Sequence, residues 1–193
     1  MKELAERGEK WARAQGRSPY DVMNNEDIYS LPVGDIAAKN SILFLWVTWP
    51  KLLEGIETIK RWGFTYKSRA FTWVKTNKVS TDTFFFGMGF WTHANDEVCL
   101  LATKGHPKRV GKAVASLVVH PLMGHSAKPP QIRDYIVELM GDLPRVELFA
   151  RETCEGWVSL GDEIDGKDMK DALREIIEAQ NNAKQLGLFK EGD

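Results

Sequence analysis

The segment HPLMGHSAKPP, residues 120–130, places side chains that bind anions among residues that form turns. His125, Ser126 and Lys128 can each donate a hydrogen bond to a carboxylate or a phosphate group. Residues 131–140 have helical periodicity, and the positive end of a helix attracts negative charge. The loop therefore predicts an anion site, although a single His or Lys is more often an ordinary surface residue.

A second candidate site follows the predicted strand 146–149. Phe149 and Arg151 lie at the end of this strand, and the acidic pair Asp162 and Glu163 comes soon afterwards. In nucleotide-binding α/β sheets, an acidic side chain at such a position accepts hydrogen bonds from the hydroxyls of a ribose. The acidic start of a helix explains the pair equally well.

Aromatic and basic side chains provide candidate contacts to nucleic acid. Trp49 follows the predicted strand 41–48, and Trp91 ends the run FFFGMGFW; planar side chains at such places can stack on a base. Trp is also an ordinary core residue. A basic run at residues 104–112 could contact phosphates or simply form a solvated surface. The candidates in this run are Lys104, Lys108 and Arg109.

Strand and helix patterns alternate along the chain and set the positions of these candidates. The apolar stretch SILFLWVT, residues 41–48, is typical of a strand buried on both faces of a parallel sheet. The pattern predicts an open α/β fold, with a mostly parallel sheet and helices on both faces. Ligands of such sheets bind beyond the carboxyl ends of the strands. The other predicted strands are 69–75, 98–103, 117–120 and 146–149, and the predicted helices are 24–31, 52–62, 131–140 and one that includes residues 169–177.

The length and composition of the chain indicate which classes of protein it can belong to. A chain of 193 residues with 43% hydrophobic content can form one domain with a buried core. Its 26 basic and 27 acidic residues nearly cancel, so a polyanion has to be held by local contacts. No apolar run approaches the roughly 20 residues of a membrane span, so we expect a cytoplasmic protein outside the membrane. Cys99 and Cys154 lack metal-ligand spacing, and no metal site is predicted.

A series of motifs between about Tyr20 and Gly166 resembles the adenine-N6 methyltransferase family. This family includes phage and bacterial DNA methyltransferases and the catalytic subunit of the eukaryotic messenger-RNA adenosine methyltransferase. The resemblance implies a Rossmann-like, S-adenosylmethionine-dependent domain over residues 1–166, followed by a helical extension over 167–193. It also implies methylation of the adenine N6 amino group, in DNA more than in RNA. The motifs are PYDVMNNEDIYSLPV, ILFLWVT, WGFTYKSRAFTWVKTNK, FFGMGFWTHANDEVCLLATKGHPKR, HSAKPPQI, VELFAR and GWVSLGDEIDG.

The resemblance implies roles for residues that would bind the cofactor. The family residue matching Lys128 contacts the methionine carboxylate, and the one matching Arg151 lies against the ribose. Asp162 and Glu163 stand where the eukaryotic enzyme has amides that reach the ribose hydroxyls, and carboxylates can accept the same hydrogen bonds. A histidine and an asparagine that follow the arginine in the family are replaced here by Thr153 and Cys154, which leaves two ribose contacts open.

Two further positions near the substrate and the cofactor follow from the resemblance. Tyr20 matches a residue in a loop near the substrate base. The loop that contains His125 and Ser126 matches one that moves over the cofactor.

Family members begin with a hydrophobic strand that ends in Asp-Pro-Pro-Trp, and this tetrad occurs nowhere in the 193 residues. Its acceptors hold the adenine amino group, whose lone pair is delocalised into the ring, while an aromatic ring stacks on the extruded base. No catalytic residue can therefore be located, and we expect the sheet to lack one inner N-terminal strand. A start chosen too late or a truncated form would explain the absence. The alternative is a non-catalytic module of the same family that binds cofactor and nucleic acid.

Overall fold

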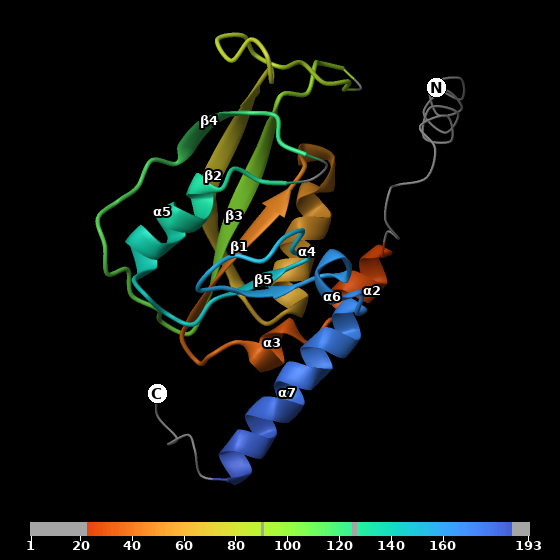
Figure 1. The fold of residues 1–193 in the computed structure, drawn as a ribbon, viewed down its shortest axis with the longest axis vertical. Coiled ribbons are helices and arrows are strands. Elements are labelled where there is room, and N and C mark those ends of the chain that lie inside the picture. The colour runs from red at the N-terminus through yellow and green to blue at the C-terminus, as the bar shows by residue number, and fades with distance from the viewer. Residues whose placement is uncertain (1–22, 90, 125–126, 187–193) are drawn as a thin grey trace.

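The computed structural model describes residues 23–89, 91–124 and 127–186, and it has the helices and strands that Figure 1 shows. Most of the predicted elements are present, and the predicted helix 131–140 has the same bounds in the structure. In chain order the elements are α2 (Asn25–Tyr29), α3 (Val33–Ile36), β1 (Ser41–Val47), the 3-10 helix η1 (Trp49–Lys51), α4 (Leu52–Arg61), β2 (Thr65–Thr76), β3 (Asp96–Lys104), β4 (Leu117–Pro121), α5 (Gln131–Met140), β5 (Val146–Leu148), β6 (Val158–Leu160), α6 (Asp162–Asp165) and α7 (Met169–Gln185).

The strands form a four-stranded sheet in the order β1-β3-β2-β4 and a parallel pair, β5-β6. Strands β1, β2 and β4 run in one direction, whereas β3 lies between β1 and β2 and is antiparallel to both. The predicted α/β class is confirmed, and the sheet is mixed rather than uniformly parallel. The reversal has a simple cause: residues 77–95 connect β2 to β3 without a crossover helix, and parallel neighbours need such a crossover.

Helices cover both faces of the four-stranded sheet, as predicted (Figure 1). Successive side chains of a strand point to opposite faces, so neighbours on β3 enter different cores. Leu100 packs in one cluster with Ile59 of α4 and Leu173 of α7. Cys99 packs in the other cluster with Phe71 of β2 and Ile132 of α5. Strand β3 is therefore buried between two helical layers. This packing fixes the positions of the ends of the neighbouring strands.

The connection from β1 to β2 depends on close packing of α4 against the sheet. Gly55 lies where an added Cβ would be only 2.5 Å from Val47 Cγ1, so a larger side chain would push α4 away. Gly63, with φ +80°, then turns the chain toward β2 in a conformation that glycine adopts without strain. This α4 crossover brings the ends of β1 and β2 to the same edge of the sheet.

Strand β1 is hydrogen-bonded on one edge only, to β3, within the described ranges. In the same ranges β5 pairs only with β6, although Leu148 and Leu160 pack against the cluster that also contacts Leu45 of β1. None of the helices in the described part of the chain is long and apolar enough to cross a membrane.

Candidate functional site

The reversed direction of β3 brings two carboxylates to the ligand-binding edge of the sheet. Val98 lies opposite Val47 at the end of β1, and Asp96 lies opposite Val74 near the end of β2. Asp96 and Glu97 therefore stand beside the carboxyl ends of β1 and β2, where ligands of α/β sheets bind. Neither residue was predicted, because in a mostly parallel sheet the ligand-binding residues are expected after strand ends, and Asp96 and Glu97 begin a strand.

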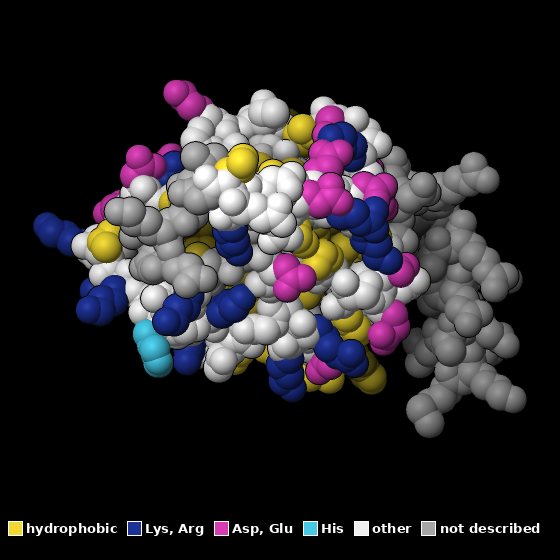
Figure 2. All heavy atoms as spheres, turned by 90° about the horizontal axis from the view of Figure 1, so that it is seen from below, with side chains coloured by type: hydrophobic (Ala, Val, Ile, Leu, Met, Phe, Trp, Pro, Cys, Tyr) yellow, Lys and Arg dark blue, Asp and Glu magenta, His cyan; other side chains and the backbone are white. Residues whose placement is uncertain are grey.

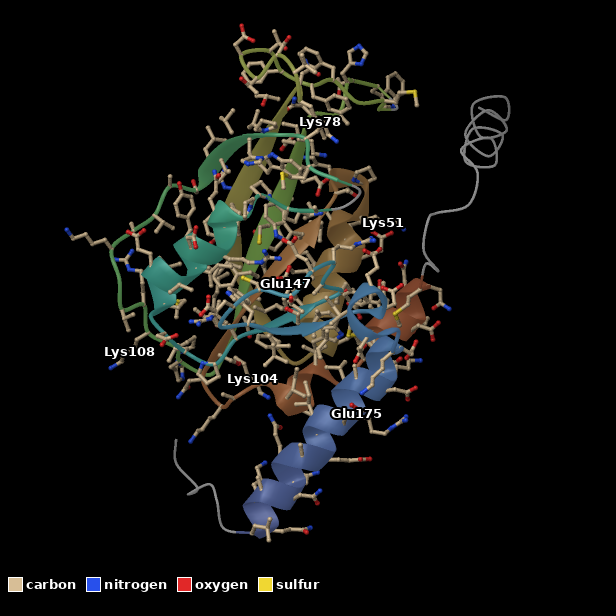
Figure 3. All side chains as sticks on the ribbon, in the orientation of Figure 1. Lys51, Lys78, Lys104, Lys108, Glu147 and Glu175 are labelled. Atoms are coloured by element: carbon tan, nitrogen blue, oxygen red, sulfur yellow. The ribbon has the colours of Figure 1, made fainter. Side chains whose placement is uncertain are left out.

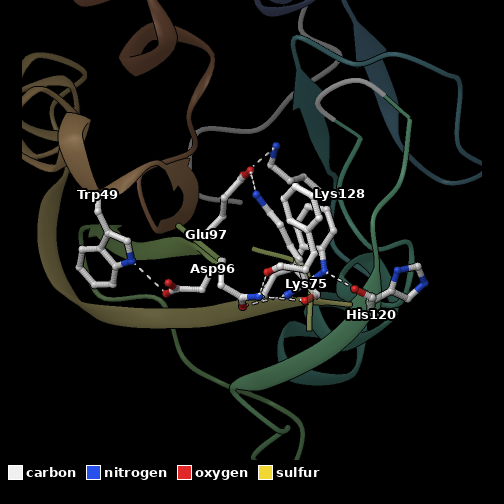
Figure 4. A network of polar contacts seen from close by, with 9 residues as sticks. Trp49, Lys75, Asp96, Glu97, His120 and Lys128 are labelled. Atoms are coloured by element: carbon white, nitrogen blue, oxygen red, sulfur yellow. Dashed lines mark hydrogen bonds and ion pairs between the residues drawn. The ribbon is translucent and has the colours of Figure 1, made fainter. Parts of the chain in front are cut away.

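Glu97 is the centre of an ion-paired cluster (Figure 4). Its Oε1 accepts from Lys75 Nζ at 2.7 Å, and its Oε2 lies 3.2 Å from Lys128 Nζ. The three side chains are between 16% and 26% exposed, so solvent screens these contacts less than it screens an open surface pair. Two cations thus face one carboxylate, and the cluster retains positive charge that can attract an anion.

The ion pairs of Glu97 predict how the stability of the fold depends on pH. Burial opposes ionisation of Glu97, but the positive charges of Lys128 and Lys75 outweigh it and lower the pKa of the carboxyl group. A folded-state pKa below the unfolded value of about 4.3 stabilises the fold above that pH. The stabilisation is lost as the pH falls through the folded-state pKa. Between about pH 6 and pH 3, the melting temperature should therefore fall more steeply for wild type than for Glu97→Gln.

Thermal unfolding followed by circular dichroism checks this expectation. Glu178, an exposed glutamate on α7, provides the matched control, and Glu178→Gln should keep the wild-type slope. Equal slopes for wild type and Glu97→Gln would show that the lysine contacts do not stabilise the ionised carboxylate.

A pocket of about 310 Å³ opens beside the Glu97 cluster. Its volume is at the lower end of the range for pockets that hold small ligands. Part of its wall is the predicted anion-binding loop, in which Lys128 is described, whereas His125 and Ser126 lie outside the described residues, as does Tyr20. The pocket is lined by Trp73, Lys75, Lys78, Glu97, Leu122, Met123, Gly124 and Ala127.

The two predicted tryptophans lie near this edge. Trp49 follows β1 in η1, is 52% exposed, and donates from Nε1 to Asp96 Oδ2 at 2.9 Å (Figure 4). Trp91 is 96% exposed and belongs to the loop 77–95, which extends beyond the ends of β2 and β3 (Figure 1). Neither side chain is buried in the core, which favours the interpretation that they are available to a ligand.

The basic residues predicted to contact nucleic acid lie elsewhere. Lys104 ends β3, so the same reversal places it at the opposite end of the sheet, where its Nζ donates to Gly34 O at 2.7 Å. Figure 3 shows Lys104 and Lys108 well away from Lys78, toward the other end of the sheet. Arg109 follows Lys108 in the chain. Seen from the Lys104 end, basic side chains gather on part of the face and are mixed with acidic ones elsewhere (Figure 2). The structure thus separates this basic group from the pocket.

Phe149 follows β5 in an unusual backbone conformation. Its φ is +58°, which is uncommon for a residue with a side chain and strained for a bulky one. The ring is 46% exposed, and next to it Ala150 N donates to Leu160 O at 2.8 Å. An added Cβ at Gly161 would lie 2.3 Å from Ala150 O, so only glycine permits this approach of the ends of β5 and β6. The two strand ends therefore form one tight unit that holds Phe149 outward.

The structure brings Arg151, Asp162 and Glu163 together at these strand ends. The Arg151 guanidinium donates to the Glu163 carboxylate and forms an ion pair with it. Asp162 Oδ1 accepts from the backbone N–H of Glu163 at 3.1 Å in the first turn of α6. That local bond uses only part of the acceptor capacity of the carboxylate. Within the described ranges, no group of three or more His, Cys, Asp or Glu side chains could hold a metal ion.

The fold defines an α/β protein, and comparison with known proteins assigns its family. The family model MT-A70 matches residues 7–163. The chain belongs to the MT-A70 family, which is a family of adenine-N6 methyltransferases.

Relatives of the chain come from bacteria and from eukaryotes. It is 32% identical over 147 residues to the type II methyltransferase M.MunI of Mycoplasma sp, covering 75% of this chain and 60% of the relative. It is 30% identical over 155 residues to a putative N(6)-adenosine-methyltransferase MT-A70-like protein of Medicago truncatula, covering 79% of this chain and 25% of the relative. The human N(6)-adenosine-methyltransferase catalytic subunit METTL3 is 28% identical over 156 residues, with coverages of 79% and 27%. The chain thus spans about a quarter of the length of these two eukaryotic relatives.

Proposed function

We propose that this protein transfers a methyl group from S-adenosylmethionine to the N6 amino group of adenine in nucleic acid, with DNA as the favoured substrate. The observation that carries the proposal is the Glu97 cluster beside the 310 Å³ pocket, at the edge of the sheet where the family motifs converge. The preference for DNA rests on the similarity to the bacterial type II methyltransferase, of which the chain covers 60%.

The side chains at this edge fit the chemical groups of S-adenosylmethionine. Lys128 supplies a cation for the carboxylate of the cofactor. Asp162 has spare acceptor capacity for the ribose hydroxyls, and the exposed ring of Phe149 can pack against the adenine. Arg151 holds Glu163 in place beside Asp162. When bound, the cofactor supplies a methyl group on a positively charged sulfur.

The described carboxylates nearest the pocket do not replace the missing tetrad. Asp96 accepts from Trp49 through one carboxylate oxygen, and Glu97 is held by two lysines through both of its oxygens, so Glu97 is already paired with two charged donors. A carboxylate that is neutralised by two ammonium groups is a weaker acceptor for an amino group than a free one. We expect these residues to orient the substrate and neutralise charge, and activation of the amine to require the acceptors of Asp-Pro-Pro-Trp, which the 193 residues do not contain.

A second candidate function is a non-catalytic module that binds cofactor and nucleic acid. The absence of Asp-Pro-Pro-Trp from the 193 residues favours it. Methyl transfer by a longer form that carries the tetrad distinguishes the two candidates, because a non-catalytic module would remain inactive.

We expect Asp162→Ala to weaken cofactor binding by roughly 1 to 3 kcal/mol in a form that carries the tetrad, the usual cost of removing a charged acceptor. The matched control is Asp165→Ala, which removes a carboxylate at the other end of the same short helix. Isothermal titration with S-adenosylmethionine measures both. If Asp162→Ala leaves the affinity unchanged, Asp162 only stabilises the start of α6.

A further inference from the structure

The loop between β2 and β3, residues 77–95, exposes an unusual amount of apolar surface. We call it the aromatic loop. Large apolar side chains that gather at the surface mark interaction sites more often than chance exposure does. The exposed members, with their exposed fractions, are Val79 (97%), Phe84 (54%), Phe86 (64%), Met88 (66%) and Trp91 (96%).

Hydrogen bonds within the aromatic loop hold its backbone in place. Gly87 and Ala94 pair as an isolated antiparallel bridge, with Gly87 N donating to Ala94 O at 2.6 Å. The Asn95 side chain donates to Lys75 O at 3.0 Å and also to Phe85 O. Since Asn95 is the last residue of the loop and Lys75 lies near the end of β2, just before the loop, these bonds close the loop at its base. The exposed side chains among the described residues of the loop thus stand on a backbone that is hydrogen-bonded at its base.

The base of the aromatic loop is also the wall of the pocket. Lys75 precedes the loop and Lys78 lies within it, and both line the pocket. Asp96 and Glu97 follow the loop directly. A molecule that covers the aromatic loop is therefore held next to the candidate site rather than at a remote face.

The charges of the aromatic loop indicate which part of a nucleic acid it would contact. Its charged residues are Lys78 and Asp82, which offset each other, so the loop does not form a basic track for phosphates. The basic group of Lys104 and Lys108 lies well away from Lys78, toward the other end of the sheet (Figure 3). Exposed aromatic rings instead bind the faces of bases by stacking, and base faces are accessible only in unpaired strands.

We propose that the aromatic loop stacks on unpaired bases beside the target adenine, so that the protein binds single-stranded nucleic acid in preference to duplex. This inference rests on the proposed function and names its substrate class. Trp91 and Phe86 are the principal stacking residues because both rings are largely exposed. Each stacked base contributes enough that removing its aromatic partner weakens binding about tenfold.

The test measures binding by the 193-residue chain, with no methyl donor present. Fluorescence anisotropy compares a labelled adenine-containing single strand of about 12 nucleotides with the same strand in a duplex, a length within the range of single-strand sites. Wild type should bind the single strand more tightly. Phe86→Ala and Trp91→Ala should each weaken single-strand binding about tenfold and leave duplex binding unchanged. Leu143→Ala, which removes a 52% exposed side chain outside the loop, is the control and should bind as wild type does.

Three results would overturn the inference: unchanged single-strand affinity in both loop variants, equal losses on single strand and duplex, or a wild type that prefers duplex. Sedimentation adds a fourth, a wild-type dimer that Trp91→Ala dissociates without any change in nucleic-acid affinity, which would make the loop a contact between copies. Because the assay needs no methyl transfer, loop variants that lose single-strand binding support the inference even if the proposed methylation is absent. Methylation by the longer form with unaltered binding by the loop variants would refute the inference alone.

Discussion

The 193-residue chain is expected to show no adenine methylation, whereas a longer form whose first strand ends in Asp-Pro-Pro-Trp is expected to methylate adenine. The adenine amino nitrogen is a poor nucleophile until preorganised acceptors hold its hydrogens, and one such group typically changes a barrier by roughly 3 to 4 kcal/mol. Placing the base near the methyl donor does not supply those acceptors. The difference between the two forms should therefore be several orders of magnitude in rate.

Transfer of tritiated methyl groups from S-adenosylmethionine measures this difference, on single- and double-stranded DNA and on RNA at matched protein concentration. Clear turnover by the 193-residue chain would mean that another residue activates the amine. The first residues to substitute would then be Asp162, Glu163 and His125, together with Glu97, which the structure adds as a carboxylate lining the pocket.

Lys128→Ala in the longer form is expected to weaken S-adenosylmethionine binding by about 1.5 to 3 kcal/mol, the value of a hydrogen bond to a charged group. The substitution removes the proposed partner of the cofactor carboxylate and one of the two cations that face Glu97. Lys108→Ala is the matched control, because it removes the same charge toward the other end of the sheet (Figure 3). Its effect on affinity should be small.

Isothermal titration gives both affinities, and thermal unfolding verifies that each variant is folded. Equal losses in the two variants would mean that only overall charge matters. A wild-type affinity for Lys128→Ala would place the cofactor carboxylate elsewhere.

The elements of the fold were largely predictable, whereas the direction of one strand was not. The apolar run 41–48 forms β1 and the helical periodicity of 131–140 forms α5, but β1 lies at an edge of the sheet with six of its seven residues only partly buried, whereas a strand buried on both faces was predicted. Periodicity is the same for a strand in either direction, so it carries no information about the reversal of β3. The available clue was the loop 77–95, which has no helical pattern and therefore cannot be a parallel crossover. Strand β6, with three residues, is too short to show a periodic pattern.

The antiparallel direction of β3 explains most of the differences between the predicted site and the site in the structure. Because β3 is antiparallel, Glu97 lies at the edge of the sheet where a ligand is expected, although it was not predicted as a site residue. Lys104, which was predicted as one, lies at the opposite end of β3. Phe149, Asp162 and Glu163 were candidates from the end of the predicted strand 146–149 and the acidic pair that follows it, but their grouping depends on the pairing of β5 with β6, which the sequence did not predict. The run of aromatic residues in the loop was recognised in the sequence. Its exposure to solvent was not predictable, because aromatic residues occur both in the core and at the surface.

Mass spectrometry of nucleosides provides the most direct test of the central claim that this site serves adenine-N6 methylation. DNA and RNA are incubated with the longer form and with S-adenosylmethionine that carries a deuterated methyl group, and the nucleic acid is then digested to nucleosides. We expect label in N6-methyladenine, at a higher level from DNA than from RNA. Label in a cytosine product, or no labelled nucleoside from an extended protein that is folded and binds the cofactor, would contradict it.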